Sequence, residues 1–330
     1  MGLRETQVRK DAGGIWSIWG HERKGRVVRI AILHTRLRIE ERHLADALEA
    51  RGAEVELVDL REVVFDPREA LRWRGFDVVL DRCVSLTSSL TAVRVLEHMG
   101  VRCINSAEAI ELCSDKLRTT LALEGASVAT PAVRVAVSPE AGLRAIEEIG
   151  YPAVLKPTVG SWGRLVSRVN DRDAAEAILE HRDTLGSVNH HVYYVQEHIE
   201  KPGRDIRVFV VGGEAIAAIT RSSAHWVTNT ARGATAAGLA VLPELGSLCT
   251  AAAACVGADV CAIDVLECPR RGYLVNEINH SMEFRNSILT SGVDIPGLVA
   301  EHVLRVARDR REARGGEARS ATALNAGVGR

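Results

Sequence analysis

Two carboxylates and an amide near the end of the chain have the residue types and spacing of a magnesium site. Asp264 lies in the apolar run 260–266, and Glu277 and Asn279 lie in a second strand-like run, 273–279. Side chains alternate between the two faces of a strand, so Glu277 and Asn279 share a face and Asp264 can lie opposite them on a paired strand. Such oxygen ligands suit Mg²⁺ shared between a few carboxylates and substrate phosphates. The pattern therefore predicts chemistry on ATP.

A lysine followed by a loop with two glycines is the second informative pattern. Lys156 ends a strand-like run, and Gly160, Ser161, Trp162 and Gly163 follow in the loop. Small residues let backbone N–H groups approach phosphate oxygens, and the lysine adds a positive charge. Neither a P-loop nor a dinucleotide-binding fingerprint occurs in the chain. The alternative is a surface hairpin with a solvated lysine, but the downstream acids favour a phosphate site.

Further residues fit the other parts of a nucleotide. Lys116, in a helical stretch, is a second candidate phosphate ligand, although a lone helical lysine is usually solvated. The end of the apolar strand 192–197 offers backbone groups to an adenine edge, and Glu200 or Asp205 beyond it can hold ribose hydroxyls. An edge strand with polar loop residues explains this stretch equally well. The predicted adenine-binding residues are Gln196, Glu197, His198 and Ile199.

Three arginines and an amide are candidates for contacts with the reacting groups. Arg207 begins a strand, Arg221 ends its return strand, and Asn229 and Arg232 lie in the loop that follows. Converging near a triphosphate, they would stabilise charge on a transferring phosphoryl group and hold a carboxylate. Ordinary surface arginines are the alternative in this arginine-rich chain.

The polar run after the predicted metal ligands is a candidate for substrate contacts, and we expect no helix to begin there. His280 can equally cap the turn. The predicted substrate residues in this run are Glu283, Phe284, Arg285, Asn286 and Ser287.

The elements that must position these residues form an α/β pattern. Strands alternating with helices over residues 28–115 predict a small parallel α/β domain. We predict a second unit over 116–198, with one helical stretch through Lys116, and a third, α+β unit over 199–308 that ends in helix 295–308. Residues 1–27 and 309–330 have few apolar residues or little periodicity, so we predict a loosely ordered extension and a disordered tail.

Composition excludes several classes of protein. The 330 residues are 46% hydrophobic and 26% charged, as in ordinary globular proteins. A net charge of −1 gives no general basic field for nucleic acid. No apolar run approaches the roughly 18 residues of a membrane span. Seven cysteines without a C-x-x-C pair predict reduced thiols and a cytoplasmic protein.

In type, order and distance these residues resemble the ATP-grasp superfamily. Within it the chain looks like the carboxylate–amine ligases that glutamylate ribosomal protein S6, and closer still to the LysX-type ligases of carrier-protein lysine biosynthesis. The resemblance covers residues 29–308. It rests on Lys116, Lys156-Pro157, the Gly160–Gly163 loop, Gln196–Ile199, Asp264 and Glu277-x-Asn279, and on the runs 156–164, 200–211, 223–233 and 276–284.

The resemblance implies an ATP-grasp fold preceded by a parallel-sheet pre-ATP-grasp domain, and ATP-driven amide formation with Mg²⁺. The carboxylate would belong to the C-terminal glutamate of a small acidic carrier protein (LysW). The amine would belong to α-aminoadipate, or to glutamate in the arginine branch. An unusual amino acid, or an ATP-binding module without catalysis, is the alternative. A homodimer or homotetramer is also implied.

The resemblance also implies roles for individual residues. Lys116 and Lys156 would bind the α- and β-phosphates, and Arg207 and Arg221 would lie near the transferring group, so Lys156, Arg207 and Arg221 are the predicted catalytic residues. The Gly160–Gly163 loop would act as a lid. Ala234 stands where this family's pattern has glycine, which leaves the amino-acid specificity open.

Overall fold

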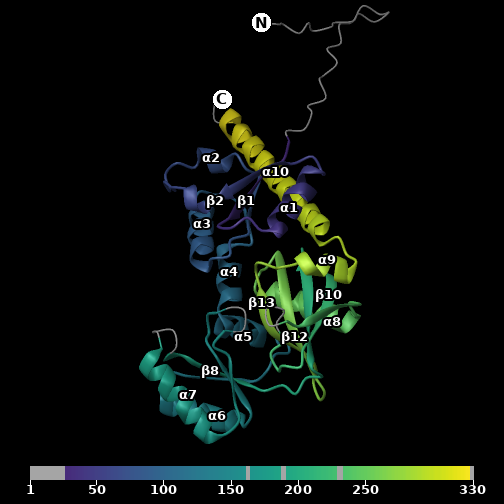
Figure 1. Ribbon diagram of the computed structural model, residues 1–330. Coiled ribbons are helices and arrows are strands. Elements are labelled where there is room, and N and C mark those ends of the chain that lie inside the picture. Colours follow the sequence, from purple (N-terminus) through teal and green to yellow (C-terminus); the bar gives the residue numbers. More distant parts are fainter. Residues whose placement is uncertain (1–26, 161–163, 187–190, 229–232, 328–330) are drawn as a thin grey trace, which may run out of the picture.

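The computed structural model describes residues 27–160, 164–186, 191–228 and 233–327, and side chains up to residue 313. The described residues form three sheets, each with its own helices (Figure 1). In Figure 1 the N-terminal sheet lies at the top, the C-terminal sheet in the middle and the central sheet at the bottom. Among these residues, no helix is both long and apolar enough to cross a bilayer.

The first sheet is parallel, as predicted, with strand order β2-β1-β3-β4. Alternate residues of β1 enter two cores: Ile30 and Ile32 pack toward α1 and the last helix, α10 (Ile295–Gly327), whereas Ala31 and Leu33 pack toward α3. The elements of this part are β1 (Arg29–His34), α1 (Ile39–Glu49), β2 (Glu54–Asp59), the 3₁₀ helix η1 (Leu60–Glu62), α2 (Leu71–Arg74), β3 (Val78–Asp81), α3 (Leu86–His98) and β4 (Cys103–Ile104).

Two helices lead from the first sheet to the second. They are α4 (Ala107–Ser114) and α5 (Lys116–Gly125), and the single helical stretch predicted through Lys116 is broken at Asp115. The Asp115 carboxylate accepts hydrogen bonds from the backbone N–H groups of Leu117 and Arg118, which makes it the N-cap of α5. Lys116 therefore occupies the first position of a helix.

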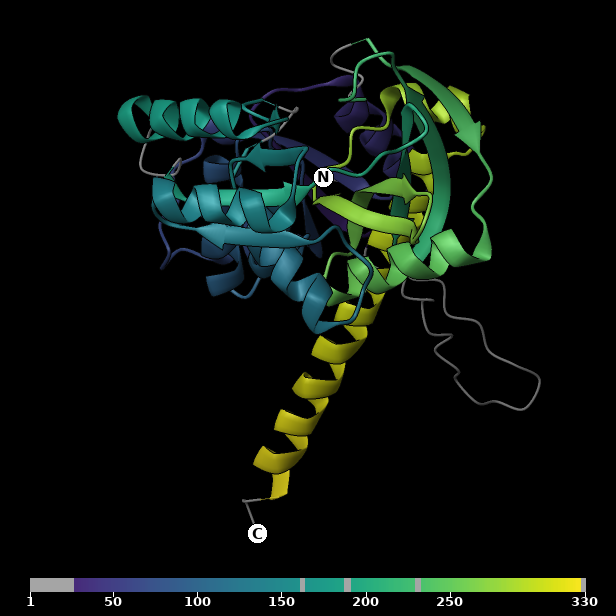
Figure 2. The same cartoon turned by 90° about the horizontal axis from the view of Figure 1, so that it is seen from below.

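The second sheet is antiparallel, with order β5-β8-β6-β7. Its helices α6 and α7 pack together on one face of the sheet (Figure 2). The elements are β5 (Val133–Ala136), α6 (Pro139–Ile149), β6 (Ala153–Lys156), β7 (Ser167–Val169), α7 (Arg172–Leu185) and β8 (Tyr193–Glu197).

The third sheet is also antiparallel, with order β11-β10-β9-β12-β13. The predicted turn between its first two strands is confirmed: Gly212 and Gly213 have φ of 58° and 83°, a conformation that suits glycine in a tight hairpin. The elements are β9 (Arg204–Val211), β10 (Glu214–Ser222), β11 (Thr235–Leu239), α8 (Pro243–Cys255), β12 (Val260–Cys268), β13 (Gly272–Asn279), α9 (Arg285–Ser291) and α10 (Ile295–Gly327).

Two predictions about the end of the chain are wrong. A short helix, α9, does begin at Arg285, because the buried Phe284 and Ser287 anchor this polar run in the core. The last helix continues to Gly327 rather than ending at 308, so the predicted disorder is not found over 309–327. Alanine, arginine and glutamate favour helix, and Arg311 ties α10 to Asp77 of the first unit. The end of α10 projects beyond the body of the molecule (Figure 2).

Candidate active site

The predicted hairpin of the metal ligands is confirmed, and Asp264 on β12 pairs directly with Glu277 on β13. The next paired residues are Val265 and Val275, so Asn276 is an extra residue in β13. Such a β-bulge redirects side chains. Asn276 therefore faces the same cavity as Glu277, although strict alternation would place it on the opposite face.

A cavity of about 760 Å³ lies between the second and third sheets. Alternation within the second sheet explains which side chains line it. Leu155 and Val195 pack against α6 and α7, so their neighbours Lys156 and Gln196 face the cavity. The predicted residues that line it are Lys116, Lys156, Gly160, Gln196, Glu197, His198, Ile199, Glu200, Asp205, Arg221, Asp264 and Glu277.

Lys156 is a buried cation with an uncharged partner. Its side chain donates to Asn276 Oδ1 at 3.3 Å, and its ammonium group lies 5.6 Å from the centre of the Tyr194 ring. Burial and the charge of Lys116 lower the pKa of Lys156 to about 7, which Glu277 opposes only in part. A bound phosphate would supply the missing negative charge, so the site fits a nucleotide.

Lys116 reaches the same place from α5. Its Nζ donates to the carbonyl oxygen of Gly160 at 2.8 Å and lies 4.0 Å from Glu277 Oε1. The backbone N–H of Lys116 also donates to Thr158 at 2.8 Å, which fastens the start of α5 to the loop after β6. Two lysines and the beginning of the glycine loop thus meet beside the metal hairpin.

Cross-strand pairing also assembles the arginines. Arg207 on β9 is opposite Asp264, and Arg221 on β10 is opposite Asp205. Arg207 donates to both Asp264 oxygens, from Nε at 2.8 Å and Nη2 at 3.0 Å, and Arg221 Nη2 lies 3.0 Å from Oδ2. Burial alone would raise the pKa of Asp264, but the two guanidinium groups outweigh it and lower the pKa to about 2. The carboxylate is therefore ionised and rigidly held.

Asp205 is already engaged within the protein. It accepts from Arg221 Nε at 2.7 Å and from the hydroxyl of Thr228, and Lys201 lies 3.8 Å away. Burial lowers the pKa of Arg221, but Asp264 and Asp205 raise it more, so the net shift is upward. Of the two predicted ribose ligands, the exposed Glu200 remains the more accessible.

The predicted adenine segment lies at the end of β8, and the side chains of Gln196 and Glu197 are already hydrogen-bonded within the protein. Gln196 Nε2 donates to Asn276 at 3.3 Å, and Glu197 Oε1 accepts from the backbone N–H of Ala132 at 2.6 Å. Gln196 and Glu197 lie in β8 between β5 and β6, and the backbone N–H of Glu197 donates to Ala132, so the backbone of His198 and Ile199, beyond the paired strand, is the better placed to pair with a base. Ile199 and Leu266 supply an apolar surface beside it.

The predicted metal ligands fit Mg²⁺ by their chemistry. No cluster of three or more His, Cys, Asp or Glu suited to a metal occurs in the described residues, and the predicted set is one amide and two carboxylates, of which Asp264 already pairs with Arg207 and Arg221. Such a sparse oxygen set suits Mg²⁺ that takes its remaining ligands from phosphates and water. Asn279 Nδ2 donates to Ala262 at 3.4 Å, which leaves Oδ1 as the atom that can bind a cation.

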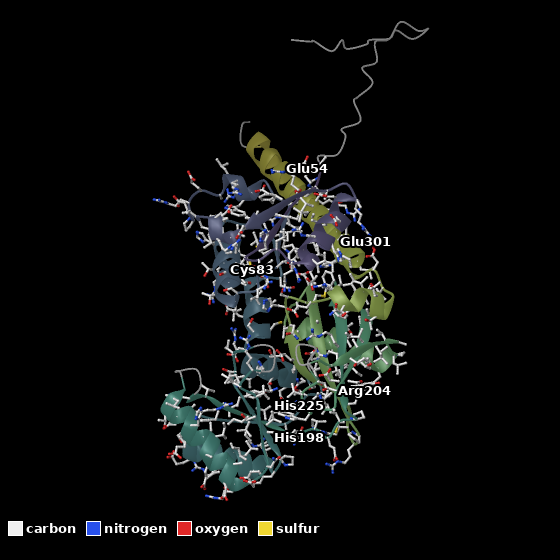
Figure 3. All side chains as sticks on the ribbon, in the orientation of Figure 1. Glu54, Cys83, His198, Arg204, His225 and Glu301 are labelled. Carbon is white, nitrogen blue, oxygen red and sulfur yellow. The ribbon has the colours of Figure 1, made fainter. Side chains whose placement is uncertain are left out.

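A second cavity of about 230 Å³ shares Gly160, Asp264 and Glu277 with the first. It opens toward the first sheet. Figure 3 labels Cys83, which lines the second cavity in the upper unit, and His198 and His225, which line the first and lie lower, toward the second sheet. Arg207 and Asn279 line this second cavity.

Only one of the predicted substrate residues after the hairpin, Glu283, lines either cavity. Phe284 is fully buried beneath the guanidinium of Arg82, Ser287 is buried, and Arg285 and Asn286 are exposed on α9. The predictions for Ser161, Trp162, Gly163, Asn229 and Arg232 fall outside the described residues.

Several cavity residues carry no clear signal in the sequence. Asn276 reaches the site because of the bulge, which period-two reasoning misses. Arg168 belongs to β7 of the second sheet and Trp226 to the loop after β10, and the guanidinium lies 5.6 Å from the ring centre. Their separation in sequence hides this contact.

Comparisons with known proteins agree with this arrangement. Residues 113–303 match the RimK-like ATP-grasp domain, and residues 30–112 match the LysX preATP-grasp domain. A glutamate–LysW ligase, ArgX, of Sulfurisphaera tokodaii is 33% identical over 84% of this chain and 98% of its own. An α-aminoadipate–LysW ligase, LysX, of the same organism is 32% identical over 84% of this chain and 96% of its own.

Among solved structures, a RimK domain ATP-grasp protein from Sphaerobacter thermophilus aligns with a TM-score of 0.70 and 31% identity, over 84% of this chain and 100% of that one. The predicted ATP-grasp fold is thereby confirmed.

Proposed function

This chain belongs to the RimK-like ATP-grasp ligase family, and on that premise we propose that it joins a carrier-protein carboxylate to the amine of an acidic amino acid. The carrier is an acidic LysW-type protein with a C-terminal glutamate, and the amino acid is α-aminoadipate. The observation that carries the nucleotide part is Lys156, a buried lysine in a cavity that Asp264 and Glu277 also line.

Glutamate is the second candidate amino acid. The relative named a glutamate–LysW ligase and the one named an α-aminoadipate–LysW ligase are equally similar to this chain, at 33% and 32% identity. Their similarity therefore supports a LysW-type carrier and does not favour one amino acid.

The residues of the chain fit the two steps of such a ligation. In the first step a carboxylate oxygen of the carrier bonds to the γ-phosphorus, and the bond from that phosphorus to the β–γ bridging oxygen breaks to release ADP. The two anions repel each other, so the site must supply cations. Lys116 and Lys156 would take the nucleotide phosphates, and Arg207 and Arg221, which also line the two cavities, would stabilise the charge of the transferring group.

In the second step the free amine attacks the acyl carbon, and phosphate leaves with the oxygen of the broken C–O bond. The proton lost by the amine passes to solvent or to the departing phosphate. Asp264, Glu277 and Asn279 would hold Mg²⁺, which when bound neutralises phosphate charge. The rigid pairing of Asp264 with Arg207 keeps these charges in place between the two cavities.

The localisation and the oligomeric state of the protein are also part of this proposal. All seven cysteines are free in the structure, and we propose a cytoplasmic enzyme. We also propose a homo-oligomer, which size-exclusion chromatography with light scattering would test.

The first experiment is phosphate release with ATP, Mg²⁺ and a LysW-type carrier, comparing α-aminoadipate with glutamate. We expect release with α-aminoadipate and a carrier mass increase of one residue. A carrier without its C-terminal glutamate is the control and should give neither. Activity with glutamate alone would establish the second candidate. Nucleotide binding without phosphate release from either amino acid would contradict catalysis.

A further inference from the structure

The second cavity contains an arginine that the sequence did not indicate. Arg38 lies in the loop between β1 and α1, in the first unit, yet it lines the cavity that ends at the metal hairpin of the third sheet. Residues far apart in the chain therefore enclose one polar space beside the reaction centre.

The guanidinium of Arg38 is hydrogen-bonded to the buried carboxylate of Glu41. Its Nη2 donates to Glu41 Oε1 at 2.8 Å and its Nε to Glu41 Oε2 at 3.2 Å. The Glu41 side chain is fully buried and also pairs with Arg82 at 3.3 Å. These contacts, with a long hydrogen bond from Nη2 to the Arg82 carbonyl oxygen at 3.4 Å, fix the plane of the Arg38 guanidinium, so less conformational freedom is lost when Nη1 binds a ligand.

The remaining nitrogen of Arg38 makes only a loose contact. Nη1 lies 3.6 Å from Glu283 Oε1, and the Glu283 side chain is 46% exposed. A partly exposed pair at this distance adds little stability. A ligand carboxylate can therefore take the place of Glu283 on Arg38.

A hydroxyl at the same cavity is also without a partner. Within the described part of the chain, the buried Oγ of Ser281 makes no hydrogen bond. Buried polar atoms are usually paired, and each exception needs an explanation. Because the atom is buried, it does not contact a ligand in the cavity directly, and the case for a bound carboxylate rests on Arg38.

The two ends of the cavity differ in a way that suits an acidic amino acid. Asp264, Glu277 and Arg207 lie at the reaction centre, where the amine must arrive. The α-carboxylate shares a carbon with that amine, whereas the side-chain carboxylate is separated from it by methylene groups. Val84 and Leu86 offer apolar wall to such methylenes, and Arg38 lies in the other unit.

We propose that the second cavity binds the amino-acid substrate and that Arg38 binds its side-chain carboxylate, a proposal that rests on the ligase activity proposed above. Arg38 thereby selects acidic amino acids over their side-chain amides.

The test compares an acidic amino acid with its side-chain amide in the R38M variant. With the carrier saturating, we expect R38M to raise the KM for the acidic amino acid about 30-fold or more. The KM for ATP and the rate with the amide should change little, so the preference for the acid is lost. R38K keeps the charge without the planar fork, and we expect an intermediate effect.

Arg36 provides the matched control, because it is exposed in the same loop and does not line either cavity. R36M should keep the KM values of the unaltered chain. If R38M folds poorly, R38Q keeps an amide donor beside Glu41 without the positive charge and tests the same point, and Glu41 keeps its pairing with Arg82 in both variants.

Equal losses with the acid and the amide, or an unchanged KM, would overturn the role of Arg38. Failure of the ligase proposal gives a different result, since the unaltered chain would then release no phosphate with any amino acid. Calorimetric titration with the acidic amino acid, in the presence of a non-hydrolysable ATP analogue, needs no turnover. Binding that is absent from the unaltered chain, or equal in R38M, would refute the proposal by itself.

Discussion

At the scale of single residues, the surroundings of Lys156 give the clearest physical support for the proposed phosphate site. A lysine with a pKa near 7 is only partly protonated at neutral pH, and its uncharged partner Asn276 does not change this. A bound phosphate would raise the pKa and complete the protonation. In the proposed function, nucleotide binding and proton uptake are therefore coupled at this residue.

This coupling predicts the pH dependence of ATP binding. Because the bound form needs protonated Lys156 and the free pKa is about 7, the Kd for ATP should rise by up to about tenfold per pH unit above that value. Below pH 7 the lysine is already protonated and contributes no further change. Calorimetry at pH 8 in buffers of different ionisation enthalpy should detect proton uptake, and K156M should lack the part that belongs to the lysine. Identical uptake in K156M would contradict the assignment.

Substitution of Glu277 should lower catalytic activity strongly while leaving the stability of the fold almost unchanged. Its carboxylate makes one long ion pair, with Lys116 at 4.0 Å, so the fold depends little on it. We expect E277Q to lower kcat by about 10²–10³, by analogy with the loss of one transition-state donor, with little change in Tm. E267Q on the same hairpin is the control, because Glu267 pairs with Arg204 and lines neither cavity. Ordinary activity of E277Q at normal Mg²⁺ would rule out the role.

At the scale of elements, strand alternation explains why much of the site could be predicted. Alternation and hairpin pairing are local rules, and they placed Asp264 opposite Glu277 without any structure. The bulge at Asn276 and the short helix α9 depend on tertiary packing, which a single sequence does not display. Arg38 was missed for a stronger reason, since the first and third units contribute to its cavity from opposite ends of the chain.

The start of α5 is an element whose geometry should control nucleotide affinity. Asp115 caps the helix and fixes Lys116 at its first position. We expect D115A to lower the free energy of unfolding by about 1 kcal/mol and also to raise the KM for ATP severalfold. S138A removes the N-cap of α6, whose hydroxyl accepts from Ala141, and should cost similar stability without affecting that KM. A KM for D115A equal to that of S138A would show that the cap does not position Lys116.

At the scale of the whole molecule, the first unit is hydrogen-bonded to the loop that follows β13. The buried Asn105 donates from Nδ2 to the carbonyl oxygens of Val260 at 2.7 Å and His280 at 2.9 Å, and accepts from the Val260 N–H at 3.0 Å. Arg82 donates to the Met282 carbonyl at 2.9 Å. These bonds hold together two units whose residues line the second cavity.

Asn105 should therefore contribute to catalysis through position as well as to stability. N105A leaves buried backbone groups of β12 and of the loop after β13 without partners, and we expect the free energy of unfolding to fall by about 1–3 kcal/mol. Asn279, a predicted metal ligand, directly precedes His280, whose carbonyl oxygen Asn105 holds. We therefore expect kcat to fall as well, while the KM for ATP changes less. S89A is the matched control: it removes a buried hydrogen bond of 2.6 Å to Asp81 that lies wholly within the first unit. Chemical unfolding and phosphate release would be measured on both variants at a temperature where each is folded. If N105A and S89A lose similar stability and kcat falls in N105A alone, the first unit acts on the reaction centre through Asn105. An unchanged kcat in N105A would show that this contact has a purely structural role.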